Sequence, residues 1–365
     1  MELKFRENGE FSILAIADAQ DTDNPQKETT DIIRYSIEKT SPDLIILLGD
    51  NIAGDFEGVT PKRTKAAVKA LLEPISEKDI PFALVFGNHD HEGLVHRCGF
   101  EEKEAKEFIL EEFQKSPLCL AVKGEPVSGV CTYNLPIISS DGKKTAFNLW
   151  LMDSGTYDNN GGYGYVQADQ NEWYIKKSDE LKEQNGGAPV PSFLFQHIPV
   201  PEVYRLMKKY PMFVPGSVTG GSALFKGFYK GYKNRQGKFR EAPCCSNTPH
   251  NQFDTWKTQG DILCAFFGHD HTNDYLAELT EQIFAPFLPQ ATIVTAGITE
   301  QEASPCMKTA LKIMTLKFFL NLICCRIRFC QNISKGTDTP NTKTGNRGRF
   351  YKGVILRQHG ACISE

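Results

Sequence analysis

The chain has 365 residues, of which 40% are hydrophobic and 24% charged, and its formal net charge is −4. This composition is ordinary for a soluble globular protein, and the length allows one large domain or two. An acidic balance gives no sign of a nucleic-acid partner, which would usually meet a basic face.

In chain order, short apolar runs alternate with helical segments, which predicts layered α/β architecture. The runs are typical of strands buried in a sheet. Strands are expected at residues 11–18, 44–50, 82–88, 131–138, 146–153, 192–196 and 262–267, and helices near residues 26–39, 61–78, 101–114, 169–183 and 200–208.

Five of these runs end in polar side chains that can bind metal or move protons. In open α/β sheets, sites assemble at the carboxyl ends of strands, so residues far apart in sequence can meet there. Oxygen and imidazole groups in this mixture suit Mn, Fe or Zn better than Ca. The residues are Asp18 and Gln20, Asp50, Asn88 and His89, His197, and finally His269 and His271.

The order of these motifs, Asp-x-Gln, Gly-Asp, Gly-Asn-His-Asp, His and Gly-His-x-His, resembles the calcineurin-like metallophosphoesterases. The resemblance runs from about Phe11 to Tyr275. It is strongest to a phosphatase branch that includes bacterial proteins and small purple-acid-phosphatase-like enzymes of plants and fungi. It implies a four-layer α/β/β/α sandwich, with two mixed sheets flanked by helices, over residues 1–300.

The resemblance also implies a centre of two divalent metal ions, Mn²⁺, Fe²⁺ or Zn²⁺, with a bridging hydroxide that attacks phosphorus. His89 would protonate the leaving oxygen, and Asp90 would orient its ring. The implied ligands are Asp18, Gln20 and His271 for the first metal, Asn88, His197 and His269 for the second, and Asp50 bridging both.

Two positions depart from the family pattern. Most members of the wider family have His where this chain has Gln20, and a neutral amide oxygen is a weaker ligand than imidazole for late first-row ions. True purple acid phosphatases have tyrosine three residues after the bridging aspartate, where this chain has Ala53. A weaker first metal site and the absence of purple colour are therefore expected.

The leading function is a two-metal phosphomonoesterase acting on a phosphorylated small molecule or a phosphoprotein. A phosphodiesterase acting on cyclic nucleotides or other diesters could use the same metal set. A third interpretation is a non-catalytic metal-binding interaction protein, although an intact His89 and a nearly complete ligand set favour catalysis. A nuclease is disfavoured because the first 300 residues carry 42 acidic and 30 basic residues.

Two glycine-rich segments are candidates for substrate recognition. Residues 209–260 form a long excursion between ligand-bearing strands, and long loops on a rigid scaffold often carry recognition. A structural insertion without a substrate role explains this segment equally well. The second candidate is Tyr157–Tyr165, where tyrosines could flank a ligand. Asp153 could orient a ligand histidine or cap a turn, and ordinary surface placement is expected for His91, His96 and His250.

Residues 301–365 form a basic tail, with 11 Lys and Arg against 3 Asp and Glu and five of the eleven cysteines. Such a shift marks a domain boundary. Lysines interrupt the apolar stretch at residues 309–325, so it gives no secure membrane span. It could be an amphipathic surface helix, or the tail could be foreign to the fold.

Residues 291–296 are expected to form a strand of the second sheet, and the tail to contribute no site residue. The amino terminus lacks an apolar leader, and the cysteines are irregularly spaced, so free thiols and a cytoplasmic location are expected.

Overall fold

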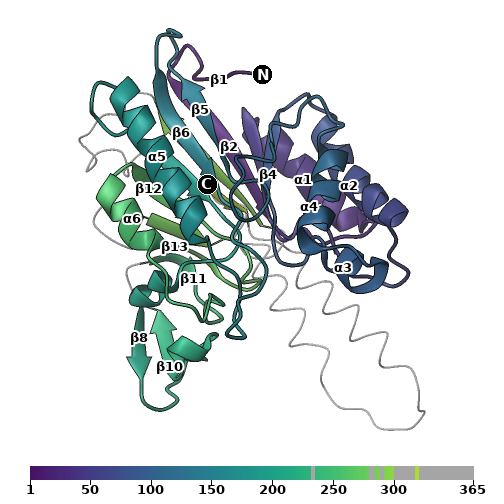
Figure 1. The fold of residues 1–365 in the computed structure, drawn as a ribbon, viewed down its shortest axis with the longest axis vertical. Coiled ribbons are helices and arrows are strands. Elements are labelled where there is room, and N and C mark those ends of the chain that lie inside the picture. The colour runs from purple at the N-terminus through teal and green to yellow at the C-terminus, as the bar shows by residue number, and fades with distance from the viewer. Residues whose placement is uncertain (232–234, 279–283, 288–291, 300–316, 320–365) are drawn as a thin grey trace, which may run out of the picture. The chain divides into compact units, whose positions relative to one another are not determined.

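The computed structural model describes residues 1–231, 235–278, 284–287, 292–299 and 317–319. The chain divides into two compact units, residues 1–324 and 325–365, and the second lies outside the described residues. The expected basic tail therefore falls almost entirely outside them too. The described part of the first unit contains two large mixed sheets, a small third sheet and the helices that flank the large sheets (Figure 1).

The smaller of the two large sheets has five strands in the order β16-β15-β2-β3-β4. Strands β2, β3 and β4 are parallel, as their continuous apolar sequences predict, and β15 runs antiparallel to β2. A strand was expected at residues 291–296, but in the second sheet. The structure places it in the five-stranded sheet beside β2, because its residues pair along the whole length of that strand. The bounds are β2 Glu10–Ala17, β3 Leu44–Leu48, β4 Phe82–Val85, β15 Thr292–Thr299 and β16 Lys317–Phe319.

The second large sheet has eight strands in the order β1-β5-β6-β7-β12-β14-β13-β11. Its centre, β6-β7-β12-β14, is parallel, and the antiparallel pairs β5-β6 and β14-β13 flank this centre. The bounds are β1 Leu3–Lys4, β5 Tyr133–Ile138, β6 Thr145–Leu151, β7 Ser192–Phe195, β11 Arg235–Lys238, β12 Ile262–Phe266, β13 Asp274–Glu278 and β14 Phe284–Phe287.

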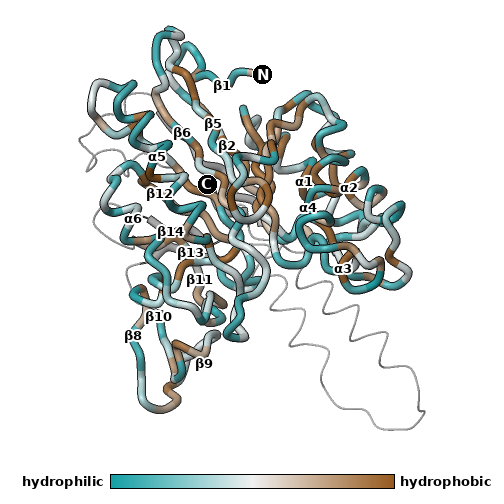
Figure 2. The backbone as a smooth tube through the Cα atoms, in the orientation of Figure 1, coloured by the Kyte–Doolittle hydropathy of each residue, from teal (hydrophilic) through white to brown (hydrophobic). Residues whose placement is uncertain are grey.

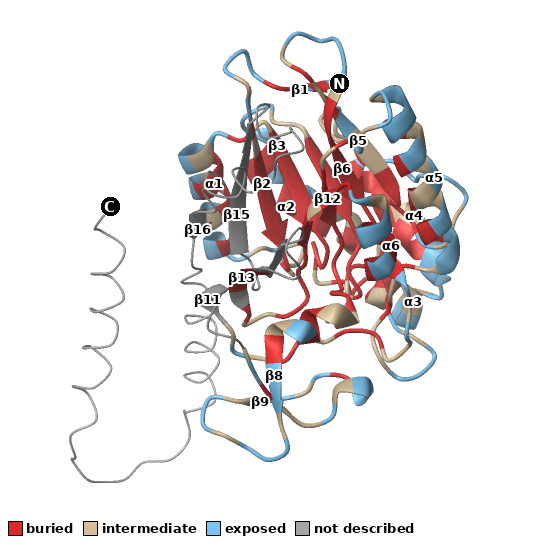
Figure 3. Ribbon diagram, turned by 90° about the vertical axis from the view of Figure 1, so that its left-hand side faces the viewer, coloured by how far each residue is buried: buried red, intermediate tan, exposed pale blue. Residues whose placement is uncertain are grey.

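Strict alternation along the central strands explains why the two sheets stack. In β7, Phe193 and Phe195 join the core that includes the five-stranded sheet, while Leu194 points into the core under the outer helices. Strand β6 repeats the pattern, with Leu149 and Leu151 on one side and Trp150 on the other. Successive strand side chains point to opposite faces, so this sheet is buried on both (Figure 3).

The helices complete a four-layer α/β/β/α arrangement, which confirms the expected fold class. Helices α1 (Lys27–Thr40), α2 (Pro61–Ser76) and α4 (Glu102–Phe113) pack beside the five-stranded sheet, and α5 (Ala168–Gln184) and α6 (Gln252–Gln259) pack beside the eight-stranded sheet (Figure 1). Helix α2 begins at a defined point because the Thr60 hydroxyl accepts a hydrogen bond from the Arg63 amide at 3.3 Å, and Pro61 occupies the first turn.

Three elements differ from the sequence-based expectation. Short helix α3 (Glu92–Cys98) follows the Gly-Asn-His-Asp motif directly, and α6 lies within the segment expected to be irregular. The expected helix at residues 200–208 is a 3₁₀ turn, Pro201–Leu206, followed at once by strand β8 (Met207–Tyr210). Strand β8 opens a small sheet of order β8-β10-β9, with β9 at Val218–Thr219 and β10 at Phe228–Gly231.

Two further expectations concern thiols and membranes. The six cysteines among the described residues are all free, as expected: Cys98, Cys119, Cys131, Cys244, Cys245 and Cys264. Within the described part of the chain, no helix has the length and apolar character to cross a bilayer. The apolar stretch at residues 309–325 lies largely outside the described residues.

Candidate metal centre

The polar residues that follow the strands sit on an unusual backbone. Asp18, Gln20, Asp50 and His269 have positive φ angles of 53°, 43°, 48° and 70°. This left-handed region is unfavourable for residues with a side chain, by about 1–2 kcal/mol each. Such conformations cluster at functional sites, where surrounding structure holds the backbone in place.

Backbone hydrogen bonds tie these strand ends together. The Asp18 amide donates to the Gly49 carbonyl at 3.1 Å, and the Gln20 amide donates to the Asp50 carbonyl at 3.0 Å. Across the two sheets, the His269 amide donates to both Asp18 carboxylate oxygens at 3.1 Å. The site is therefore assembled by both sheets, with each loop held by its neighbour.

Glycines permit this close approach. A Cβ atom on Gly49 would lie 2.5 Å from Nδ1 of His197, and one on Gly87 would lie 2.1 Å from Oδ1 of Asp50. These separations are far below van der Waals contact, so a side chain at either glycine would displace a candidate ligand. The glycine in each motif thus clears space for the polar residue of another loop.

Two groups of donor atoms meet at Asp50. Asp50, His197 and His269 form one group, and Asp18, Asp50 and His271 form the other, with the donor atoms of each group within 4.8 Å of one another. The Nε2 atom of His197 lies 3.2 Å from Oδ2 of Asp50, and the Nε2 atom of His271 lies 3.6 Å from Oδ1 of Asp18. A carboxylate shared by two donor groups suits a pair of metal ions.

The donor atoms fit divalent metals in a second respect, because several are buried without a hydrogen-bond partner. These are Oδ1 of Asn88 and both ring nitrogens of His269. Buried polar atoms are normally hydrogen-bonded, so unpaired donors converging on one point need another partner. Metal coordination supplies it, which agrees with the candidate roles of Asn88 and His269.

The charges in the cluster are strongly coupled. Burial opposes the charged form of His197, yet the carboxylates of Asp50 and Asp18 raise its pKa to about 10. Burial alone would raise the pKa of Asp50, but the imidazole of His197 and its neighbours bring it below the usual value. Burial and the neighbouring His197 hold the pKa of His269 well below its usual range. The carboxylates of Asp18 and Asp50 thus favour a positive charge at this position, whether it is a proton on His197 or another cation.

Gln20 lies at the centre but faces it with its amide nitrogen. The Nε2 group donates a hydrogen bond to Oδ2 of Asp50 at 2.9 Å. The structure therefore brings Gln20 to the expected place, beside the proposed bridging carboxylate. Its role as a metal ligand remains a prediction.

The structure corrects the partner expected for His89. Asp90 does not contact the His89 ring: its carboxylate accepts hydrogen bonds from the backbone amides of residues 51, 52 and 87. Oε2 of Glu92 instead lies 2.6 Å from Nδ1 of His89. The physical reason is that Asp90 is fully buried, with its carboxylate taken up by three amides, whereas Glu92 opens helix α3 three residues after His89.

Asp90 is a structural residue of the site. Through the three amides it fastens the loop that bears Asp50 to the loop that bears Asn88. Burial, and then the charge of Asp50, raise the pKa of Asp90 to about 6. Its ionised form is held by the amides, so Asp90 positions ligands without facing the metals.

A tyrosine-bearing loop, residues 156–165, closes over the histidines. The Tyr157 hydroxyl donates to Oε1 of Glu92 at 2.8 Å, and Tyr157 and Tyr163 pair across the loop. The Tyr163 ring lies edge-on to His269, with centroids 4.1 Å apart. The sequence pointed to this loop as a substrate segment, and the structure places its tyrosines directly against two site residues.

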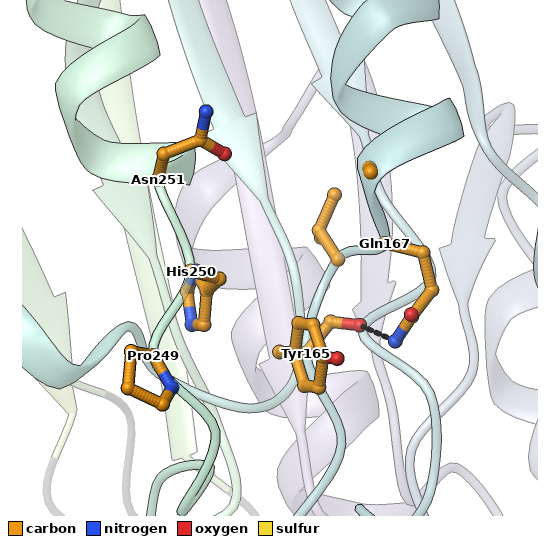
Figure 4. A pocket seen from close by; sticks show the side chains of 7 residues that line it. Tyr165, Gln167, Pro249, His250 and Asn251 are labelled. Carbon is orange, nitrogen blue, oxygen red and sulfur yellow. Dashed lines mark hydrogen bonds between the residues drawn. The ribbon is translucent and has the colours of Figure 1, made fainter.

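Beyond Tyr163 the loop borders an open pocket. Tyr165 stacks on His250, with centroids 5.1 Å apart and planes within 5° (Figure 4). The pocket lies between the starts of helices α5 and α6, where Gln167 and Asn251 immediately precede them (Figure 4). His250 is half-buried, so ordinary surface placement does not describe it.

Other polar residues act as supports. Asp153 accepts hydrogen bonds from the amides of Val130 and Gly155 and pairs with buried Lys106 at 3.1 Å, so it secures the start of the tyrosine loop instead of orienting a ligand histidine. His91 was expected at the surface but is buried and contacts Thr156 Oγ1 at 3.2 Å. His96 is exposed, as expected.

Glu92 and Lys106 were not identified from the sequence, and Tyr163 was expected only as a residue that could flank a ligand. Glu92 had a readable signal, since an acidic residue three positions after His89 at a helix start can reach back to it. The contact of Tyr163 with His269 spans more than a hundred residues and had no local signal.

Comparison with known proteins adds independent findings. Residues 11–273 match the model of a family described as calcineurin-like phosphoesterase. Probable inactive purple acid phosphatase 28 of Arabidopsis thaliana is 29% identical over 313 residues, covering 76% of this chain and 70% of the relative. Phosphatase DCR2 of Saccharomyces cerevisiae is 27% identical, covering 69% of this chain and 39% of that protein. Among solved structures, a putative 5'-nucleotidase from Staphylococcus aureus aligns at 9% identity with a TM-score of 0.42, covering 96% of this chain and 58% of that one.

Proposed function

Because the chain belongs to the calcineurin-like phosphoesterase family, we propose that it is a phosphomonoesterase that depends on two divalent metal ions. The observation that carries the proposal is the pair of donor groups that share Asp50. Seven residues match the ligand positions of the family. Six of them have the residue types that the family uses there, and the seventh is Gln20, where most members have His. Two ions of the Mn²⁺, Fe²⁺ or Zn²⁺ type fit this mixture of oxygen and nitrogen ligands.

When bound, such metals neutralise a phosphate group and activate water for attack on phosphorus. The chain supplies their positions. Asp18 and His271 would hold one ion, His197 and His269 together with Asn88 would hold the other, and Asp50 is common to both donor groups. Nδ1 of His197 contacts the Leu48 carbonyl at 3.0 Å, which directs its Nε2 atom toward the carboxylates. Such partners fix the ring orientation of a ligand histidine.

His89 is the proposed proton donor to the leaving oxygen. Its side chain is 40% exposed, so a substrate can reach it, and its backbone amide donates to Oδ1 of Asp50 at 2.8 Å. Glu92 engages Nδ1, which leaves Nε2 for the substrate. A positioned acid of this kind contributes about 10²–10⁴-fold to the rate.

The tyrosine loop is the proposed recognition element for the organic part of the substrate. Tyr157 is 54% exposed and its hydroxyl contacts Glu92, while Tyr163 borders His269. Aromatic side chains offer a flat apolar surface with a polar tip. The substrate is a phosphorylated small molecule or a phosphorylated side chain whose leaving group can lie against these rings.

A second candidate is a metal-binding protein without turnover. Three plant relatives carry the words probable inactive in their names. In this chain, Gln20 stands at the position where the wider family has an imidazole ligand, and its amide nitrogen donates a hydrogen bond to Asp50. A poorly held first metal would leave the second site able to bind a phosphate group without hydrolysing it.

A metal-reconstituted activity screen separates these functions. The full chain, stripped with chelator, is loaded with Mn²⁺, Fe²⁺ or Zn²⁺ and assayed with p-nitrophenyl phosphate and bis(p-nitrophenyl) phosphate, with bound metal measured in parallel. The proposal expects two metals per chain and faster hydrolysis of the monoester. Faster diester hydrolysis would indicate a phosphodiesterase. Metal binding without hydrolysis of either ester would support the non-catalytic candidate.

A further inference from the structure

The small sheet β8-β9-β10 and its connections form a lobe, residues 207–231, that takes no part in the metal centre. The lobe contains Lys208, Lys209, Lys226 and Lys230 and no acidic residue, although the first 300 residues carry a net charge of −12. All four lysines are exposed. None of the ion pairs among the residues that the structure describes involves them. We call this region the basic lobe.

The lobe also gathers exposed apolar side chains. Met212 is 69% exposed, Phe213 63% and Leu224 47%, and among the described residues only four other large apolar side chains are classed as exposed. Met212 and Phe213 follow β8, and Leu224 lies in the connection that leads into β10. Exposed apolar residues gathered in one region mark an interaction surface more often than scattered ones do.

Met212 and Phe213 belong to one end of the lobe, whereas Leu224 lies in a turn whose neighbours Ala223 and Phe225 contact Asn247 and Tyr204. Strand pairing brings Tyr210, Thr219 and Phe228 to the same register, where β8 and β9 finish and β10 begins. The connection that follows β8 extends from that end, and β8 points away from the large sheets (Figures 1 and 2). The outer end of the lobe is therefore its most apolar part.

The lysines lie immediately behind this end. The Lys230 ammonium donates to the Pro215 carbonyl at 3.1 Å, which places its charge in the same connection as Met212 and Phe213. Lys226 follows Leu224 by two residues. Along the axis of the lobe, apolar side chains come first and positive charges next.

A like-charge pair points to an anionic partner. Lys208 and Lys230 face each other directly across β8 and β10. Like charges in this position destabilise an antiparallel pair. On the same face, Phe213 packs edge-on against Phe228 at 6.0 Å, so the lysines border an aromatic surface. Negative charge near this face would relieve the repulsion.

We propose that the basic lobe docks the protein on an anionic lipid surface, with Met212 and Phe213 entering the interface and the lysines contacting lipid phosphates. In a lipid leaflet an anionic headgroup layer lies over an apolar layer. The apolar end of the lobe would therefore reach the apolar layer while the lysines behind it lie among the headgroups. A projecting end suits a fluid surface, whereas a protein partner usually needs a broad complementary patch. Each lysine near such a surface strengthens binding by about 1 kcal/mol, or roughly 5-fold.

Tyr204 fixes the lobe to the rest of the domain. Tyr204, in the 3₁₀ turn, stacks on Phe225 at 3.8 Å and meets Tyr229 edge-on at 4.9 Å. Its hydroxyl accepts from the Gly221 amide and donates to the Pro243 carbonyl, both at 2.8 Å. The lobe is thus fixed to the segment that follows His197, and docking would hold the metal centre at a defined distance from the lipid.

The test is sedimentation of the full chain with phosphatidylcholine vesicles, with and without phosphatidylserine, at low and raised salt. Binding is expected only with phosphatidylserine, and it should weaken as salt rises. Lys208→Gln combined with Lys230→Gln should weaken binding by roughly 25-fold. The matched control is Lys62→Gln with Lys103→Gln, which removes two exposed lysines from helices α2 and α4 and should change little.

A second measurement reports on insertion. The Phe213→Trp variant should show a blue-shifted fluorescence when phosphatidylserine vesicles are added, and Met212→Ser should weaken binding at raised salt. Circular dichroism confirms that each variant is folded. No binding, equal binding to neutral vesicles, equal effects of both lysine pairs, or an unshifted fluorescence spectrum of the vesicle-bound Phe213→Trp variant would each overturn the proposal. So would binding to polyglutamate without binding to vesicles, which would indicate an acidic protein partner.

Discussion

The basic lobe begins at Met207, ten residues after the candidate ligand His197. The metal centre is nevertheless buried, whereas the lobe is largely exposed. At the centre, Asp18, Asp50 and His197 are fully buried, and both large sheets hold them. In the lobe, strands of two to four residues carry exposed lysines, and the connections between them carry the exposed Met212, Phe213 and Leu224. The positions of the candidate ligands are thus fixed by packing, whereas the side chains of the lobe are available because they are not packed.

This difference explains how each region tolerates change. A substitution at the centre alters neighbours from several loops, because every loop there holds another. A substitution in the lobe alters one exposed side chain. The predictions below test that contrast, starting with the most severe effect.

Asp50→Asn should abolish hydrolysis and empty both metal positions. Asp50 is the carboxylate common to both donor groups, and asparagine keeps its size but not its charge. The loss of affinity should exceed the about 10–100-fold typical of changes to residues that only support a ligand. Metal content measured after gel filtration checks this. Two metals retained at full occupancy would show that Asp50 is not shared.

His89→Ala should keep both metals and lower kcat by about 10²–10⁴-fold. The defect should be smaller for nitrophenyl esters, which need little protonation of the leaving oxygen, than for alkyl phosphates. A comparison of kcat across leaving groups measures this. A uniform loss across the series would remove His89 from the role of acid.

Glu92→Gln is the companion experiment to His89→Ala. It keeps the size of the group that contacts Nδ1 of His89 but removes its charge. We expect the same dependence on the leaving group with a smaller loss, because the acid remains and only its orientation weakens. Asp90→Asn should instead disturb metal binding, since Asp90 fastens the ligand loops.

Gly49→Ala and Gly216→Ala compare the two regions directly. Both glycines have positive φ, 88° and 78°, so alanine is strained at each by about 1–2 kcal/mol. At Gly49 the new Cβ would also press on the His197 ring, whereas at Gly216 the nearest atom is Lys230 Nζ at 3.6 Å. Thermal unfolding should show the larger shift for Gly49→Ala, with loss of metal. Equal shifts would contradict the contrast between the regions.

Gln20→His should give the mildest change, tighter metal binding at the first site. Imidazole is a better donor than an amide for late first-row ions. Titration of the stripped protein with Zn²⁺ or Mn²⁺ measures it. Unchanged or weaker affinity would show that the Gln20 side chain serves only to hold Asp50, as its present hydrogen bond does.

The layered fold and most of the site were readable from the sequence because their signals are local. An apolar run followed by a polar motif identifies both a strand and the residue at its end, as at Leu44–Leu48 and Asp50. The contacts of Glu92 with His89 and of Asp90 with backbone amides were harder, because two acidic residues close in sequence compete for one histidine. Only their backbone positions decide which one reaches it.

The lobe and helix α6 could not be predicted, for a different reason. Strands of two to four residues are too short to show a period, and a glycine-rich sequence favours no element strongly. Helix α6 buries Phe253 and Trp256 against the sheet, so its stability comes from tertiary packing. The boundary near residue 300 and the character of the tail remain predictions.

The left-handed backbone at Asp18, Gln20, Asp50 and His269 has a wider consequence. Glycine would relax the chain at all four positions, so the centre is locally frustrated in favour of the side chains it presents. Aspartate enters this region more readily than most residues with a side chain, so the strain is greatest at Gln20 and His269, at about 1–2 kcal/mol each. At Asp18 and Asp50 the strain is offset by hydrogen bonds that the carboxylates accept from the His269 and His89 amides. The strained backbone is thus held by the side chains it presents, so the unfolding free energies of glycine variants report on the site without any activity assay.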